Sequence, residues 1–179
     1  MKRLVWILVF LLALGPLAKA ERCGLWVVRD ALTDKGQIDR AVGLAQDLGI
    51  DFLLLQVNGR GEAYYQSRLF PRAELAEDFD PLAYAIEQSR RAGLKVHAWV
   101  NVLTMGSFVY RPQDPRHVLN QHPEWFMVDA EGENLLAYER GNSYLPAPML
   151  EPALPEVQTF LRAMVRELVE DYDVEGIHL

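Results

Sequence analysis

The stretch DPLAYAIEQSRRAGLKVHAWVNV, residues 80–102, contains the pattern that decides the fold. Asp80 is suited to cap a helix, and Pro81 suits the first helical position, where a backbone N–H has no intrahelical partner. Gly93 ends this helix, and Val96 to Val102 then form a strand in which every second residue is apolar. The stretch therefore predicts a helix that leads directly into a buried strand.

The same order of elements is found on both sides of this stretch. Before it, a strand at 25–29 precedes an amphipathic helix that ends at Gly49, and Phe52 to Val57 form a near-continuous apolar run. After it, Pro155 begins a helix with a broad apolar stripe, and residues 177–179 begin a fourth strand. Strands that alternate with helices, with no hairpin signal between them, predict an α/β protein with a parallel sheet.

Loop lengths favour a barrel over a doubly wound sheet. The segments after helices are short, whereas those after the second and third strands, 58–79 and 103–154, are long. In a (β/α)8 TIM barrel the loops after the strands build the active site. A doubly wound sheet needs a glycine-rich turn after its first strand, and residues 29–33 offer none. Because a barrel has eight strands, we expect a TIM barrel truncated to about its first four β/α units.

Residues 1–20 have the three parts of a secretory signal peptide. A basic pair, Lys2-Arg3, precedes an apolar centre from Leu4 to Leu14, and Ala18-Lys19-Ala20 is an A-x-A cleavage site. The apolar centre is shorter than the ~20 residues that span a bilayer, so we expect cleavage and no stable membrane insertion afterwards. The remaining domain, residues 21–179, is expected to be periplasmic or secreted by a bacterium.

Charge and cysteine content narrow the classes of partner. Without Lys2, Arg3 and Lys19 the chain has 15 basic and 25 acidic residues, a net charge of −10. This balance argues against nucleic acid and anionic membrane surfaces as partners. Cys23 is the single cysteine, which excludes an intrachain disulfide and a cysteine-based zinc site, and its distance from Ala20 argues against lipidation.

Polar side chains are expected to share one face of the sheet, on the lumen side of the barrel. In the third strand His97, Trp99 and Asn101 alternate with apolar residues, and in the second strand Gln56 and Asn58 oppose the apolar set. His178 lies in the fourth strand and Arg29 ends the first. This pattern indicates a substrate site, although Gln56 and His97 could instead be paired polar groups of the core.

The loops after the second and third strands contain a guanidinium and many aromatic rings. Arg60 lies between two glycines and could hold an acidic or hydroxyl-rich ligand, while Tyr64 or Tyr65 could stack on a sugar. The alternative is that both tyrosines only anchor the loop to the barrel rim. Further aromatics of the second loop are Phe108, Tyr110, Trp125, Phe126, Tyr138 and Tyr144. His117 and His122 stand outside any zinc-binding motif, so no metal and no other cofactor is expected.

Four ordered segments resemble a known bacterial family, the glycosyl-hydrolase-like family 10 domain, once catalogued as a domain of unknown function. They are Gln56–Tyr65, His97–Asn101, His122–Trp125 and Tyr172–Leu179, and the match runs from about Glu21 to Leu179. The chain departs from the family pattern at Asn58, where the family often has arginine. It also departs at Glu62, Glu175 and Glu151, which replace aspartates.

The resemblance implies a TIM-barrel glycosidase that acts on a bacterial envelope polysaccharide, such as peptidoglycan glycan stripped of its peptides. Such chemistry needs two carboxylates that flank the glycosidic bond. The resemblance implies that they follow Leu179, so the catalytic residues are unassigned and the 179-residue product is expected to be inactive. The residues implied to bind the substrate are Gln56, Asn58, Arg60, Tyr64, Tyr65, His97, Trp99, Asn101 and His178.

Two other classes of function remain open at this point. A non-catalytic carbohydrate-binding or scaffold protein would keep the same platform without the carboxylate pair. A metal-dependent polysaccharide deacetylase or amidohydrolase would lose its activity in the presence of a chelator.

Overall fold

A computed structural model describes residues 22–76, 78–141 and 147–179, so the expected signal peptide lies outside the described residues. Its sheet has the strand order β1-β2-β4-β5, and all neighbours in this order are parallel. The strands are β1 (Gly24–Val27), β2 (Phe52–Gly59), β4 (Lys95–Val100) and β5 (Gly176–His178). The prediction of a parallel α/β sheet built in chain order is therefore confirmed.

Strands β1, β2 and β4 are each followed by a helix or by a long connection that leads to one. The helices are η1 (Arg29–Leu32), α2 (Lys35–Asp47), α3 (Pro81–Arg91), α4 (Val118–Gln121), η2 (Pro123–Trp125), η3 (Leu135–Ala137) and α5 (Pro155–Asp171). Asp80 caps α3 as predicted, because its Oδ1 accepts a hydrogen bond from the Ala83 N–H at 3.0 Å. Beyond α2 and α3, Gly49 and Gly93 turn the chain at φ values of 66° and 75°.

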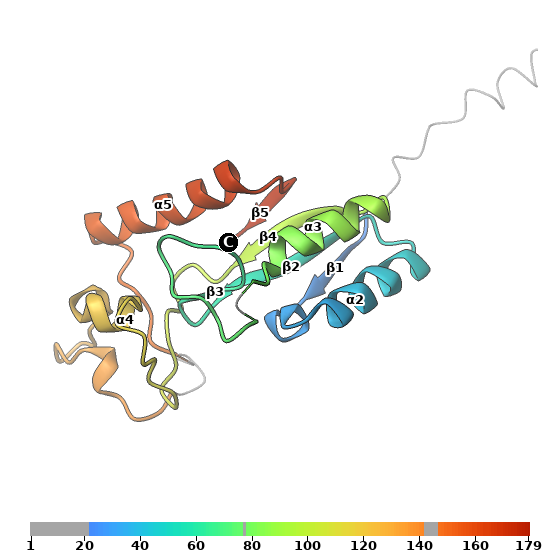
Figure 1. Ribbon diagram of the computed structural model, residues 1–179. Helices are drawn as coiled ribbons and strands as arrows, with labels where there is room; N and C mark the ends of the chain where they lie inside the picture. The colour runs from blue at the N-terminus through green and yellow to red at the C-terminus, as the bar shows by residue number, and fades with distance from the viewer. Residues whose placement is uncertain (1–21, 77, 142–146) are drawn as a thin grey trace, which may run out of the picture.

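Helices α2, α3 and α5 cover one face of the sheet (Figure 1). Right-handed crossovers between neighbouring parallel strands put every connecting helix on the same side. The core lies between the two layers, where alternate strand residues meet the apolar stripes of the helices. Its members include Val27, Leu53, Leu55, Val57, Val96, Ala98, Ile38, Val42, Leu82, Ala85, Met164 and Leu168, all of them buried.

The opposite face of the sheet is concave. Two strands lie between β1 and β5, so three inter-strand spacings of ~4.8 Å would place β1 and β5 about 14 Å apart in a flat sheet. Nevertheless the rings of Trp26 on β1 and His178 on β5 are only 5.7 Å apart between centroids. The sheet must therefore curve strongly toward this face, as the wall of a barrel does, and its four β/α units form half of a (β/α)8 barrel.

The structure corrects the expectation that the chain has no hairpin. A short strand, β3 (Glu62–Ala63), pairs antiparallel with the end of β2, and Gly59 lies opposite Glu62. The two connecting residues, Arg60 and Gly61, have φ values of 60° and 80°, as the central residues of a type I′ turn do. The hairpin escapes the sequence pattern because its second strand has only two residues.

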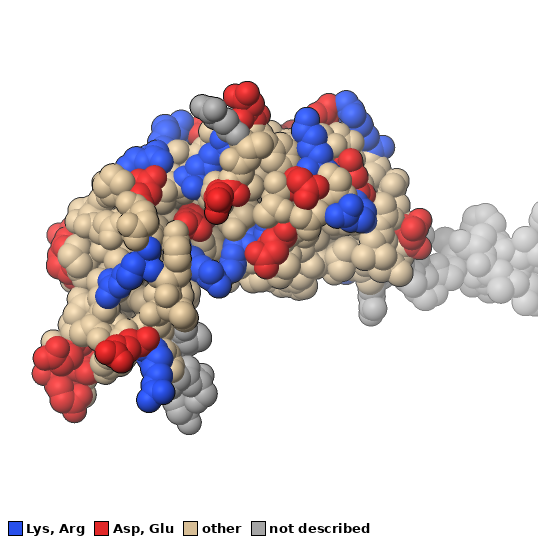
Figure 2. All heavy atoms as spheres, turned by 60° about the horizontal axis from the view of Figure 1, so that its bottom comes forward, with Lys and Arg blue, Asp and Glu red and all other residues tan. Residues whose placement is uncertain are grey.

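The longest connections leave the carboxyl ends of β2 and β4, as the barrel hypothesis requires. The segment between β4 and α5 contains α4, η2 and η3 and extends from one end of the body, so that the outline in Figure 2 is arched. Acidic and basic side chains are interspersed over the face shown there. In the part of the chain that the structure describes, every helix is too short or too polar to cross a bilayer.

Candidate functional site

Aromatic rings form the floor of the concave face. The rings of Trp26 and Trp99 meet edge to face at 4.8 Å, and Trp26 has the same relation to His178. Trp26 is 54% exposed although it points into the concavity. Indole faces of this kind bind the C–H faces of sugar rings, while neighbouring polar groups take the hydroxyls. Of these rings, Trp99 and His178 were predicted to bind the substrate, and the structure brings them together.

Two histidines form a pair on the same face. His97 Nδ1 lies 3.1 Å from His178 Nε2, so one of the rings donates a hydrogen bond to the other. The His97 ring also stacks on Phe52 at 4.6 Å, and it passes over Gly176, where a Cβ would lie 2.9 Å from Nδ1. Burial, together with the His178 charge, lowers the pKa of His97. A mutually bonded pair of imidazoles, of which burial favours the neutral form of His97, therefore lies beneath the mouth of the half-barrel, where the strands have their carboxyl ends.

Gln56 and Arg29 connect the ends of β1 and β2. The backbone N–H of Arg29 donates to Gln56 Oε1 at 3.2 Å, and Gln56 is buried. The Arg29 side chain then crosses the end of β2 over Gly59, where an added Cβ would lie 2.9 Å from Arg29 Cδ. Strand β1 ends at Val27, so Arg29 begins η1 and does not end the strand as expected. Its guanidinium nevertheless lies at the mouth.

Glu62 was noted in the sequence only as a departure from the family pattern, and the structure places it at this mouth. Burial raises the pKa of its carboxyl, while the positive charges of Arg60 and Arg29 act in the opposite direction. Burial also raises the pKa of Tyr64, against the effect of the Arg29 charge. Glu62, Tyr64 and the two guanidiniums therefore form one electrostatic cluster. The alternation of residues along the strands could not predict this cluster. The β2–β3 hairpin folds back and brings Glu62 next to the carboxyl end of β2.

The turn that carries Arg60 is held from a distant part of the chain. His117, which precedes α4, lies with its Nε2 2.8 Å from the Arg60 carbonyl oxygen. Its Nδ1 accepts a hydrogen bond from the Leu119 N–H at 3.1 Å, so Nε2 carries the proton and donates. His117 is fully buried, and burial lowers its pKa. This histidine is thus a neutral bridge within the protein.

Asn58 does not lie where the alternation predicts it. The pairing shifts by one residue between Gln56 and Asn58, so that Asn58 lies opposite Val100, whose side chain is in the covered core. The extra residue forms a β-bulge. Beyond it, each side chain of the strand points to the opposite face of the sheet from the one that the alternation predicts. Asn58 is fully buried, and its amide atoms have no hydrogen-bond partner among the described residues. Asn101 follows β4 and is partly exposed.

Tyr65 is an anchor of the loop and not a platform for sugar. It is fully buried, its hydroxyl donates to Glu167 on α5 at 3.2 Å, and its ring meets Tyr172 edge to face at 5.6 Å. Ser67 Oγ and the Arg68 N–H also donate to the Glu167 carboxylate, both at 2.6 Å. Tyr65, which was predicted among the substrate-binding residues, therefore packs inside the protein and anchors the loop to α5.

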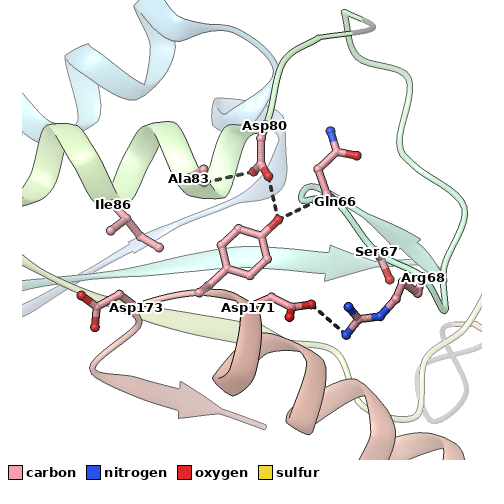
Figure 3. Close-up of a pocket in the computed structure, with 9 residues that line it drawn as sticks. Gln66, Ser67, Arg68, Asp80, Ala83, Ile86, Asp171 and Asp173 are labelled. Carbon is pink, nitrogen blue, oxygen red and sulfur yellow. Dashed lines mark hydrogen bonds and ion pairs between the residues drawn. The ribbon is translucent and has the colours of Figure 1, made fainter.

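A hollow of about 680 Å³ lies on the helix side of the sheet, between α3 and α5 (Figure 3). Its centre is Tyr172, whose hydroxyl donates to Asp80 Oδ2 at 2.6 Å and accepts from the Gln66 N–H at 2.8 Å. Across the hollow, Arg68 pairs with Asp171 at 2.8 Å. These groups bond to one another and fasten the segment after β3 to the helices. Its position away from the strand ends separates it from the candidate site.

Most described aromatics of the β4–α5 connection pack within it or against α5, where Trp125 meets Phe160 at 5.6 Å, whereas Tyr110 is exposed. The rings of His122 and Trp125 stack at 3.7 Å, Phe126 is buried, and Phe108 lies 6.5 Å from Tyr138. Tyr144 falls outside the described residues. Within those residues no group of three or more potential metal ligands is found.

The half-barrel and the polar cluster at its strand ends define an α/β-barrel protein with a site where barrel enzymes carry theirs. A family model described as Glycosyl hydrolase-like 10 matches residues 17–179, and the chain belongs to this family. The family resemblance predicted from the four segments is confirmed.

Named relatives agree with this family. The chain is 26% identical to the glycosyl hydrolase YngK of Bacillus subtilis over 166 residues, which cover 86% of this chain and 30% of YngK. It is 28% identical to the glycosyl hydrolase DigH of Escherichia coli over 167 residues, 83% of this chain and 34% of DigH. The chain thus spans about a third of the length of these curated relatives.

The fold is also similar to that of the α-galactosidase TtGalA from Thermus thermophilus. The TM-score is 0.55 at 15% identity, and the matched region covers 88% of this chain and 30% of the galactosidase. At this identity the likeness concerns the fold.

Proposed function

We propose that this chain is the substrate-binding half of a glycoside hydrolase that acts on a bacterial envelope polysaccharide, such as peptidoglycan glycan stripped of its peptides. The observation that supports the proposal most is the concave face, where Trp26, Trp99 and His178 form an aromatic floor below the polar cluster at the mouth. Membership of a glycosyl hydrolase-like family supports the same reaction type.

The residues of the site divide into two roles in this proposal. Trp26 and Trp99 stack on sugar rings, while Gln56, His178 and the guanidiniums of Arg29 and Arg60 take hydroxyl or acidic groups. Hydrolysis needs one carboxyl that protonates the leaving oxygen and a second that acts as nucleophile or base. We propose that this pair is contributed from outside the residues described here. In this proposal Glu62 is part of the polar cluster that binds the substrate at the mouth.

The proposed place of action is the periplasm or the cell exterior, reached through cleavage after Ala20. Sequencing of the mature N-terminus is expected to begin at Glu21. A mature protein that still begins at Met1, or one that carries a lipid on Cys23, would contradict this part of the proposal.

Activity and binding are tested on peptide-free glycan strands, with intact peptidoglycan and chitin as comparison substrates. Release of new reducing ends by the protein expressed from its gene is expected with the peptide-free strands. Trp99→Ala should weaken binding roughly five- to thirtyfold, because stacking on one ring contributes on the order of 1–2 kcal/mol. Trp125→Ala is the matched control, since this ring stacks on His122 away from the concave face.

The outcomes separate the functions under consideration. Hydrolysis that is lost with Trp99→Ala supports the glycosidase. Binding of the strands without hydrolysis indicates a carbohydrate-binding protein instead. Absence of both binding and hydrolysis, or equal loss with Trp125→Ala, would refute the assignment of the concave face.

A further inference from the structure

The β2–β3 turn holds Arg60 in a conformation that an arginine does not favour. Its φ of 60° lies in the left-handed region, where the Cβ of an L-residue crowds the following carbonyl oxygen. Type I′ turns usually have asparagine, aspartate or glycine at this position. The Arg60 side chain is exposed, and its guanidinium belongs to the electrostatic cluster at the mouth through its attraction for the Glu62 carboxyl. The turn therefore presents an exposed cation at the mouth, and other contacts must hold its backbone.

His117 makes the contact that holds this turn. Its side chain is buried and reaches the Arg60 carbonyl oxygen, 57 positions away in the sequence. The other ring nitrogen is engaged with the Leu119 N–H, so the imidazole cannot rotate without breaking both bonds. The adjacent Gly61 leaves room for the ring, because a Cβ there would lie 2.6 Å from Nε2. The backbone of the turn and the imidazole thus fit against each other in one arrangement.

We propose that His117 is a positioning residue, which fixes the β2–β3 turn so that the Arg60 guanidinium is presented to the bound glycan. This inference rests on the proposed function, because it assumes that Arg60 contacts a sugar. His117 acts through the Arg60 backbone and does not touch the substrate. Its loss should therefore weaken glycan binding and raise KM, while kcat stays nearly unchanged.

Two substitutions separate this role from the role of His117 as the cap of α4. His117→Asn keeps an acceptor near the position of Nδ1 and can still cap the Leu119 N–H, but its shorter side chain does not reach Arg60. His117→Gln places an amide donor near the position of Nε2 and can restore the bond to the Arg60 carbonyl. We expect His117→Asn to weaken the binding of peptide-free glycan strands about tenfold, and His117→Gln to recover most of the loss. His122→Asn, which changes a partly exposed histidine of the same connection, should bind like the wild type.

A double-mutant cycle shows whether the effect passes through Arg60. Arg60→Ala should weaken binding, and adding His117→Asn should weaken it no further, because the group being positioned is already absent. Additive losses would overturn the proposal, since His117 would then act on binding by another route. Wild-type affinity in His117→Asn would overturn it as well.

A second measurement keeps the test independent of the proposed function. The backbone ¹⁵N order parameter of Gly61 should fall in His117→Asn and stay unchanged in His122→Asn. If the wild-type protein binds no glycan strands while Gly61 behaves in this way, the proposed function fails and the positioning of the turn stands. An unchanged order parameter in His117→Asn overturns the positioning.

Discussion

Removal of the Glu167 carboxylate should destabilise the protein by about 3–5 kcal/mol. This side chain is 2% exposed and accepts hydrogen bonds from Ser67 Oγ and the Arg68 N–H at 2.6 Å each, and from the Tyr65 hydroxyl at 3.2 Å. Hydrogen bonds to a charged group are worth about 1.5–3 kcal/mol each, but losses within one network do not add fully. The ion pair with the exposed Arg68 side chain, at 3.6 Å, contributes little.

Urea denaturation of two variants measures this contribution. Glu167→Ala leaves three donors without their acceptor, the buried Tyr65 hydroxyl among them, and should show the full loss. Glu167→Gln keeps one acceptor and should lose about half as much. Glu170→Gln is the matched control on the same helix, because Glu170 is exposed and lies 3.9 Å from Arg166. A Glu167→Ala variant within about 0.5 kcal/mol of this control would refute the view that Glu167 anchors the loop.

Further predictions concern the turn, its histidine and pH. Gly61→Ala should cost at least 1 kcal/mol more than Gly132→Ala in urea denaturation, because both glycines have positive φ but only Gly61 is tight against His117. Equal losses would show that the close contact is unimportant. Since burial lowers the pKa of His117, its contribution to the free energy of unfolding is complete above the unfolded-state pKa of about 6.5 and is lost as the pH falls below it. Urea midpoints between pH 7.5 and 5.5 should therefore decline, and His117→Asn should flatten the decline. An equally steep decline in that variant would contradict the assignment. Finally, Glu62→Gln should not abolish hydrolysis of glycan strands by the protein expressed from its gene, because Glu62 is assigned to binding; turnover that disappears with Glu62→Gln would contradict this assignment.

The sequence by itself determined the layered α/β architecture and most of the side chains on the concave face of the sheet. Alternating apolar and polar residues in β4 place His97 and Trp99 on the concave face, because strand side chains alternate with period two wherever the ladder is regular. The cap at Asp80 and the glycine at position 93 delimit α3 through local backbone chemistry. Such features depend on neighbours in the chain, so a pattern can reveal them.

Only the tertiary structure decided how the mouth is assembled. The bulge before Asn58 breaks the alternation and turns this residue to the other side, and a single extra residue leaves no mark in the hydrophobic pattern. The bond from His117 to the Arg60 carbonyl joins segments 57 positions apart and depends on a backbone atom that every residue has. The contact between Trp26 and His178 exists because the whole sheet curves, and curvature is a property of all four strands together.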